Sequence, residues 1–114
     1  MTRPRKILCL FYFAIAAVAL VACWRENLSY APAGPFVGLS DFLRDLRLTA
    51  ASRSIAIDIS LFFLSASVWM VSEAKRLRMR WVSLYIVFGL IIAISVTFPL
   101  FLIARERALD KAGL

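Results

Sequence analysis

The sequence contains no histidine and only two cysteines, Cys9 and Cys23. A zinc, haem or dithiol redox centre therefore lacks a ligand set, and we expect neither a metal nor another cofactor. Both cysteines fall in one apolar run, where a helix would hold them about 20 Å apart, so no disulfide is expected between them. No pattern typical of a catalytic or ligand-binding site occurs elsewhere, and the sequence leaves the biochemical activity open.

Charge is also scarce. Only 18% of the residues are charged, 62% are hydrophobic, and the mean hydropathy is +0.82. A water-soluble chain of 114 residues could not bury so much apolar surface in its own interior. The sequence therefore predicts an all-α membrane protein whose residues 1–114 form a single transmembrane domain.

Three apolar runs of about the length needed to cross a bilayer predict three transmembrane helices. An outer loop and a tight basic turn connect them, and the turn is so short that the second and third helices must be antiparallel neighbours. Pro99 should kink the third helix near its outer end. The predicted spans are about 7–24, 55–72 and 81–104, with the outer loop at 25–54 and the inner turn at 73–80.

The outer loop holds one further helical pattern. Apolar residues recur at spacings of three and four from Leu39 to Leu48, and Ser40 could cap the start of a short helix. This helix would either lie in the membrane interface or fold over the outer mouth of the bundle.

The net charge of +7 comes from basic residues that gather where the apolar runs end. They indicate contact with lipid headgroups and not with nucleic acid. In the three-span arrangement the Lys and Arg counts are equal on the two sides, but they are densest in Arg3 to Lys6 and Lys75 to Arg80. This density predicts a cytoplasmic N-terminus and a C-terminus on the outside.

The first run also has a second interpretation. Leu20-Val21-Ala22-Cys23 matches a bacterial lipoprotein signal, in which the cysteine is acylated and becomes the mature N-terminus. We expect the first helix to be retained, because bulky Phe11-Tyr12-Phe13 suits a permanent span. The intact mass of the protein distinguishes a retained first helix from a cleaved and acylated form.

The candidate functional or structural polar residues are Asp58, Glu73, Arg105 and Glu106. A carboxylate inside a span is costly and needs a partner, so Asp58 is expected to pair at the outer boundary with Arg105, the first candidate, or with Arg107 or Arg53. Glu73 should pair at the inner boundary with Lys75, Arg76 or an N-terminal cation. The spacing also predicts that one face of the second span carries the residues Asp58, Phe62, Ser65, Trp69 and Ser72.

The second half of the chain resembles the small bacterial membrane proteins of the domain of unknown function 2834 family. The resemblance rests on Asp58-Ile59-Ser60, Glu73-Ala74-Lys75-Arg76, Trp81, Phe98-Pro99-Leu100-Phe101-Leu102 and Arg105-Glu106-Arg107. Where that family tends to have an Asn-Pro step and a glycine, this chain has Thr49-Ala50-Ala51-Ser52 and Ala93. The resemblance implies a three-helix protein of the bacterial inner membrane and implies no activity.

Three functions are compatible with these observations. The first is an accessory or scaffold protein whose partners are membrane lipids and other membrane proteins or a second copy of itself. The second is an enzyme that modifies a membrane-dissolved lipid or isoprenoid with Asp58 as the acid. The third is a small transporter subunit, which would have to oligomerise to enclose a path.

Overall fold

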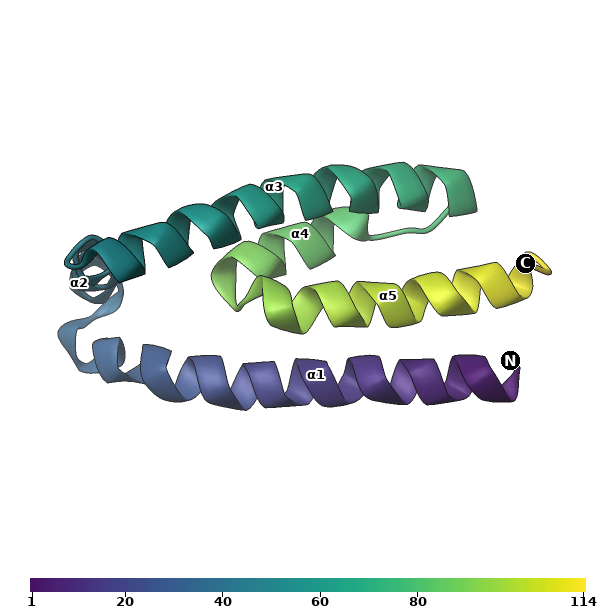
Figure 1. The fold of residues 1–114 in the computed structure, drawn as a ribbon, viewed down its shortest axis with the longest axis horizontal. Helices are drawn as coiled ribbons and strands as arrows, with labels where there is room; N and C mark the ends of the chain where they lie inside the picture. Colours follow the sequence, from purple (N-terminus) through teal and green to yellow (C-terminus); the bar gives the residue numbers. More distant parts are fainter.

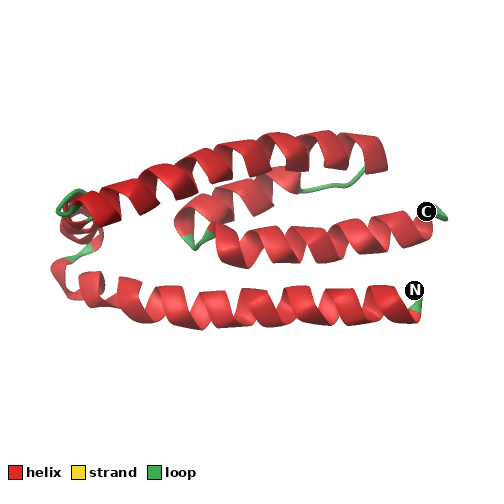
Figure 2. Ribbon diagram, viewed as in Figure 1, coloured by secondary structure: helices red, strands yellow, loops and turns green.

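The structure is a computed structural model that describes residues 1–114. It is built from helices without a strand (Figure 2), which confirms the predicted all-α class. In chain order the segments are α1 (Arg3–Asn27), the 3₁₀ helix η1 (Leu28–Ala33), α2 (Pro35–Asp45), α3 (Ala50–Leu77), α4 (Val82–Ile91) and α5 (Ile94–Lys111).

The two long helices α1 and α3 cover the first two predicted spans. Each is long and apolar enough to cross a membrane, and little of either apolar stretch is buried inside the molecule. The start of α3 is fixed by a capping box, in which Thr49 and Ser52 satisfy each other's backbone N–H groups. Its last turn carries Lys75 and Arg76, which complement the helix dipole.

The third predicted span is not one helix. Residues 81–104 divide into α4 and the first part of α5, and α5 folds back beside α4 (Figure 1). The change of direction occurs at Ile92 and at Ala93, whose backbone is extended. Pro99, where a kink of the third span was expected, lies inside α5 and not at this change of direction. At about 1.5 Å per residue α4 is only about 15 Å long, half of a bilayer core.

Two contacts explain why the chain turns at this point. The Ile92 carbonyl lies at the break, and the indole Nε1 of Trp24 on α1 donates a hydrogen bond to it at 2.9 Å. Gly89 lets α5 approach α4 closely, because a Cβ atom there would lie 2.7 Å from Oγ1 of Thr97. The first contact joins residues far apart in the chain, and the second joins residues across the turn. The spacing of apolar residues along one helix therefore predicts neither contact.

The hairpin brings the two termini to the same end of the molecule (Figure 1). The Met1 ammonium lies 3.4 Å from Oδ2 of Asp110, and the turn between α3 and α4 lies at this end too. The expected placement of the N- and C-termini on opposite sides is therefore wrong for this structure, because α4 and α5 together return to the end from which α4 starts. We call this end the terminal end.

The short helix of the outer loop exists, but α2 begins earlier than predicted. Gly34, with φ of 86°, precedes Pro35 in the first turn, so Ser40 lies inside the helix and does not cap it. α2 packs on η1, where the Tyr30 hydroxyl donates to Oδ2 of Asp45 at 2.6 Å and its ring meets Phe42 edge-on. Its position in a membrane interface stays a prediction.

The core is centred on α5, which contacts α1, α3 and α4. Phe101 is fully buried and packs against Trp69 of α3 and Tyr85 of α4. On α3 the buried stripe consists of the small or flexible side chains Ala66, Met70 and Ala74, one turn apart.

Candidate functional site: a charged network and an exposed carboxylate

Three of the four predicted polar residues meet between α3 and α5 at the terminal end. Arg105 Nε donates to Oε2 of Glu73 at 2.6 Å. Arg76 donates to both oxygens of the same carboxylate, at 2.9 and 3.0 Å. The expected pair of Glu73 with Arg76 is thus confirmed. On the other side, Arg105 Nη1 lies 3.6 Å from Oε1 of Glu106.

The network continues from Glu106 to α1. Glu106 is buried, and its Oε2 lies 3.2 Å from Nε of Arg5. Arg5 also approaches Asp110 at 3.7 Å, and Asp110 receives the terminal ammonium of Met1. Because Glu106 and Asp110 are four residues apart, they share the face of α5 that meets α1. A continuous chain of opposite charges therefore ties α3, α5 and α1 together.

Arg105 is held from its apolar side as well. Its guanidinium carbon lies 5.3 Å from the centre of the Trp69 ring, within range of a cation–π interaction. Trp69 packs in turn on Phe98 and Phe101. The charges of Glu73, Arg105 and Glu106 are thus partnered and largely shielded, which suits a clamp between helices and not a proton donor or acceptor.

Asp58 stands apart from this network. It is exposed on α3 and makes no ion pair or hydrogen bond with another side chain. The expected pairing of Asp58 with Arg105 is wrong, because the hairpin returns Arg105 to the opposite end of α3, beside Glu73. Along a helix, fifteen residues from 58 to 73 correspond to about 22 Å.

The predicted polar face of the second span divides into two. Phe62 and Trp69 turn toward α5, where both rings contact Phe98. Asp58 stays on an exposed face with spacings of four and three. We call it the Asp58 face, and its residues are Ser54, Asp58, Leu61, Ser65, Val68 and Ser72.

An apolar pocket of about 860 Å³ lies at the other end of the molecule. It is bounded by Trp24, by α2 and by the α4–α5 turn, and Ser60 of α3 reaches it. Asp58 lines neither this pocket nor the larger one at the terminal end. An enzyme that uses Asp58 as an acid would need a substrate cavity beside that carboxylate, and neither of these two pockets provides one. No group of three or more potential metal ligands is present.

Sequence reasoning missed Arg5, Trp24 and Asp110 as contact residues. Asp110 could have been found, because it follows Glu106 by one helical turn. The contacts of Trp24 and Arg5 depend on the hairpin, which the sequence pattern does not reveal.

Comparison with known proteins finds one match. No curated protein and no solved structure matches this chain. The model of a family described as a protein of unknown function, DUF2834, matches residues 11–107. That range contains α1 from residue 11 onward, all of α3 and α4, and Arg105 and Glu106 of α5. The chain therefore belongs to the DUF2834 family, as the resemblance of its second half implied.

Proposed function

We propose that this protein is an accessory protein of the bacterial inner membrane that binds a helix of another membrane protein through the Asp58 face. The observation that supports the proposal is the exposure of Asp58 on a long apolar helix without a partner in its own chain. A carboxylate that faces lipid at the centre of a span costs about 2.5–3.5 kcal/mol on insertion scales, and Asp58, eight residues after the start of α3, would carry part of that cost. A partner that supplies a cation or a hydrogen-bond donor removes much of that cost.

The rest of the Asp58 face suits a neighbouring helix. Ser54, Ser65 and Ser72 are small, so another backbone can approach closely, and Leu61 and Val68 add apolar contact. The spacing of three and four along the face is the repeat by which two helices pack over several turns. The partner is therefore a transmembrane helix with a donor group at the depth of Asp58.

A different protein fits this face better than a second copy. All copies of one chain cross a membrane in the same orientation, so a symmetric dimer through this face would place two Asp58 carboxylates side by side at equal depth. Like charges at close range repel. A partner with Arg, Lys or Asn at that depth avoids the repulsion.

We also propose that both termini are cytoplasmic and that α4 and α5 form a re-entrant hairpin. With α5 folded back, ten of the fourteen basic residues belong to the terminal end, and four belong to the end that holds α2. The excess of cations on one side is the usual mark of the cytoplasmic face. The helix lengths agree, since α4 reaches only about halfway through a bilayer core.

The orientation leads to a first prediction. A reporter that is active only in the cytoplasm should be active after Leu114 and also when inserted at Arg78, and inactive at Arg47 in the loop after α2. An active reporter at Arg78 together with an inactive one after Leu114 would contradict the hairpin and would restore a third full span.

A second prediction concerns the partner. A photoreactive amino acid at Ser65, in intact cells, should form one discrete crosslinked product heavier than the chain by the mass of another protein. Asp58→Leu should abolish this product, and Asp58→Asn should retain part of it because an amide still accepts a hydrogen bond. Mass spectrometry of the product identifies the partner.

The matched control is the same probe at Val18, which is exposed on the apolar helix α1. It should not give the Asp58-dependent product. A product with twice the mass of the chain would mean self-association, and labelling of lipid alone at Ser65 would mean that the Asp58 face has no protein partner. Either result overturns the proposal.

A further inference from the structure

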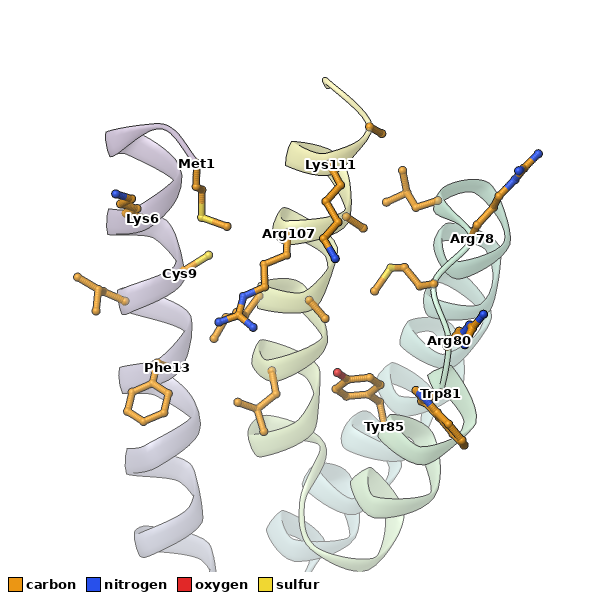
Figure 3. Close-up of a pocket in the computed structure, with 18 residues that line it drawn as sticks. Met1, Lys6, Cys9, Phe13, Arg78, Arg80, Trp81, Tyr85, Arg107 and Lys111 are labelled. Atoms are coloured by element: carbon orange, nitrogen blue, oxygen red, sulfur yellow. The ribbon is translucent and has the colours of Figure 1, made fainter.

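A pocket of about 1290 Å³ opens at the terminal end between α1, the α3–α4 turn and α5 (Figure 3). Its lining includes cations from all three elements and no acidic residue. These cationic side chains are Lys6, Arg78, Arg80, Arg107 and Lys111.

None of the five pocket cations has a partner within the protein. The acids of the terminal end are already occupied: Glu73 binds Arg76 and Arg105, while Glu106 and Asp110 bind Arg5 and the N-terminus. Five positive groups without a counter-charge around one opening create a strong attraction for an anion. Their N–H donors remain free to bind its oxygens.

α5 produces this separation of charge by its helical spacing. Glu106 and Asp110 are one turn apart on the face toward α1, whereas Arg107 and Lys111 are one turn apart and line the pocket. The acids thus fasten the bundle, and the cations one position further along the chain are left for a ligand.

Below the cations the pocket wall is apolar. Leu10 and Phe13 come from α1, and Leu100, Ile103 and Ala104 come from α5. In Figure 3, Phe13 lies deeper along α1 than Lys6, and their separation of seven positions corresponds to about 10 Å of helix. Trp81 and Tyr85 also line the pocket, and such rings prefer the boundary between headgroups and hydrocarbon.

We propose that this pocket binds an anionic phospholipid, with its phosphate beside Arg107 and Lys111 of α5 and an acyl chain against the apolar wall, while the other three cations add attraction at longer range. A small soluble anion would use only the cations and leave the apolar wall uncovered, whereas a lipid matches both parts of the pocket. The inference shares the membrane location of the proposed function, but it uses none of the residues of the Asp58 face. The lipid site and the protein partner can therefore be tested separately.

The test uses the full chain in a neutral detergent, titrated with phosphatidylglycerol or with zwitterionic phosphatidylcholine. Native mass spectrometry reads the fraction of protein that carries one lipid. We expect phosphatidylglycerol to bind more tightly. Arg107→Gln with Lys111→Gln should weaken its binding roughly 25-fold, because each cation near an anionic headgroup is worth about fivefold in affinity. Circular dichroism checks that each variant keeps its helix content.

Two further variants keep the test specific. Lys6→Gln with Arg80→Gln removes pocket cations from the other two elements and should give a smaller loss in the same direction, because these cations act at longer range. Arg3→Gln with Lys75→Gln removes the same charge from exposed positions of the terminal end outside the pocket, and it should leave the affinity nearly unchanged.

Three results would overturn the proposal. The first is a loss of lipid affinity in the Arg3→Gln, Lys75→Gln control equal to that in the Arg107→Gln, Lys111→Gln variant, which would mean that only the net charge of the protein matters. The second is equal affinity for the two lipids in the unmodified chain. The third is binding of glycerol phosphate as tight as that of phosphatidylglycerol, which would assign the site to a soluble phosphate.

Discussion

Replacing Gly89 by leucine is expected to open the α4–α5 hairpin and to destabilise the protein by several kcal/mol. Even the Cβ atom of alanine would lie 2.7 Å from Oγ1 of Thr97 and 3.1 Å from Cδ1 of Ile94. Overpacking of this kind costs about 1–3 kcal/mol for a small addition and more for a larger one. Helix propensity alone predicts the opposite sign for Gly89→Ala, a gain of about 1 kcal/mol. Thermal unfolding in neutral detergent, followed by circular dichroism, measures the difference.

Two variants show whether the close approach is the cause. Ser83 is exposed on the same helix, so Ser83→Leu introduces the same side chain and should change stability by less than about 0.5 kcal/mol. Thr97→Ala removes the nearest atom and should recover part of the stability that Gly89→Ala loses. A Gly89→Ala protein as stable as the original would show that α4 and α5 do not pack as described.

Replacing Glu73 by glutamine is expected to destabilise the protein by about 2–3 kcal/mol. The change removes the carboxylate that accepts from Arg105 at 2.6 Å and from Arg76 at 2.9 Å, and it leaves Arg105 shielded without its main counter-charge. The value lies between that of an exposed ion pair and that of a fully buried one, because about a quarter of the Arg105 side chain is accessible. Thermal unfolding in detergent, calibrated with a denaturant titration, provides the measurement.

A double-mutant cycle isolates the contact. Arg105→Gln alone should also destabilise, and the protein with both changes should lose at least about 1 kcal/mol less than the sum of the single losses. The matched control is Asp41→Asn, which removes an exposed ion pair with Arg44 on α2 and should cost less than about 0.5 kcal/mol. Strictly additive losses for Glu73 and Arg105 would mean that the pair contributes nothing to holding α3 and α5 together.

Features that depend on local sequence could be predicted. The helices over 7–24 and 55–72 follow from apolar runs, the second with Asp58 as its one charged residue, and such runs need hydrogen bonds within the segment wherever water is excluded. The pair of Glu73 with Arg76 follows from a spacing of three residues on one helix. The family resemblance rested on short local patterns for the same reason, and the match over 11–107 confirms it.

Features that depend on contacts between distant residues could not be predicted. Residues 81–104 have the composition of a single span, and the pattern has no signal for a turn at Ile92. The turn relies on Trp24 and Gly89, which act only once α1, α4 and α5 are together. Because residues 81–104 were predicted as one span, Arg105 was expected at the outer end, near Asp58. In the structure Arg105 lies at the terminal end and pairs with Glu73.

The bond between Trp24 and Ile92 also sets an order of events during synthesis. The two residues are separated by 68 positions, so α1 is complete long before the carbonyl of Ile92 is made. In an unbroken helix that carbonyl would accept from the N–H of Val96, but here Val96 donates to Ala93. One indole on α1 and one amide on the emerging chain thus compete for the same oxygen. The Trp24 indole takes the place of the missing helical donor at Ile92, and the break that it stabilises is the point at which the chain turns back toward its own N-terminus.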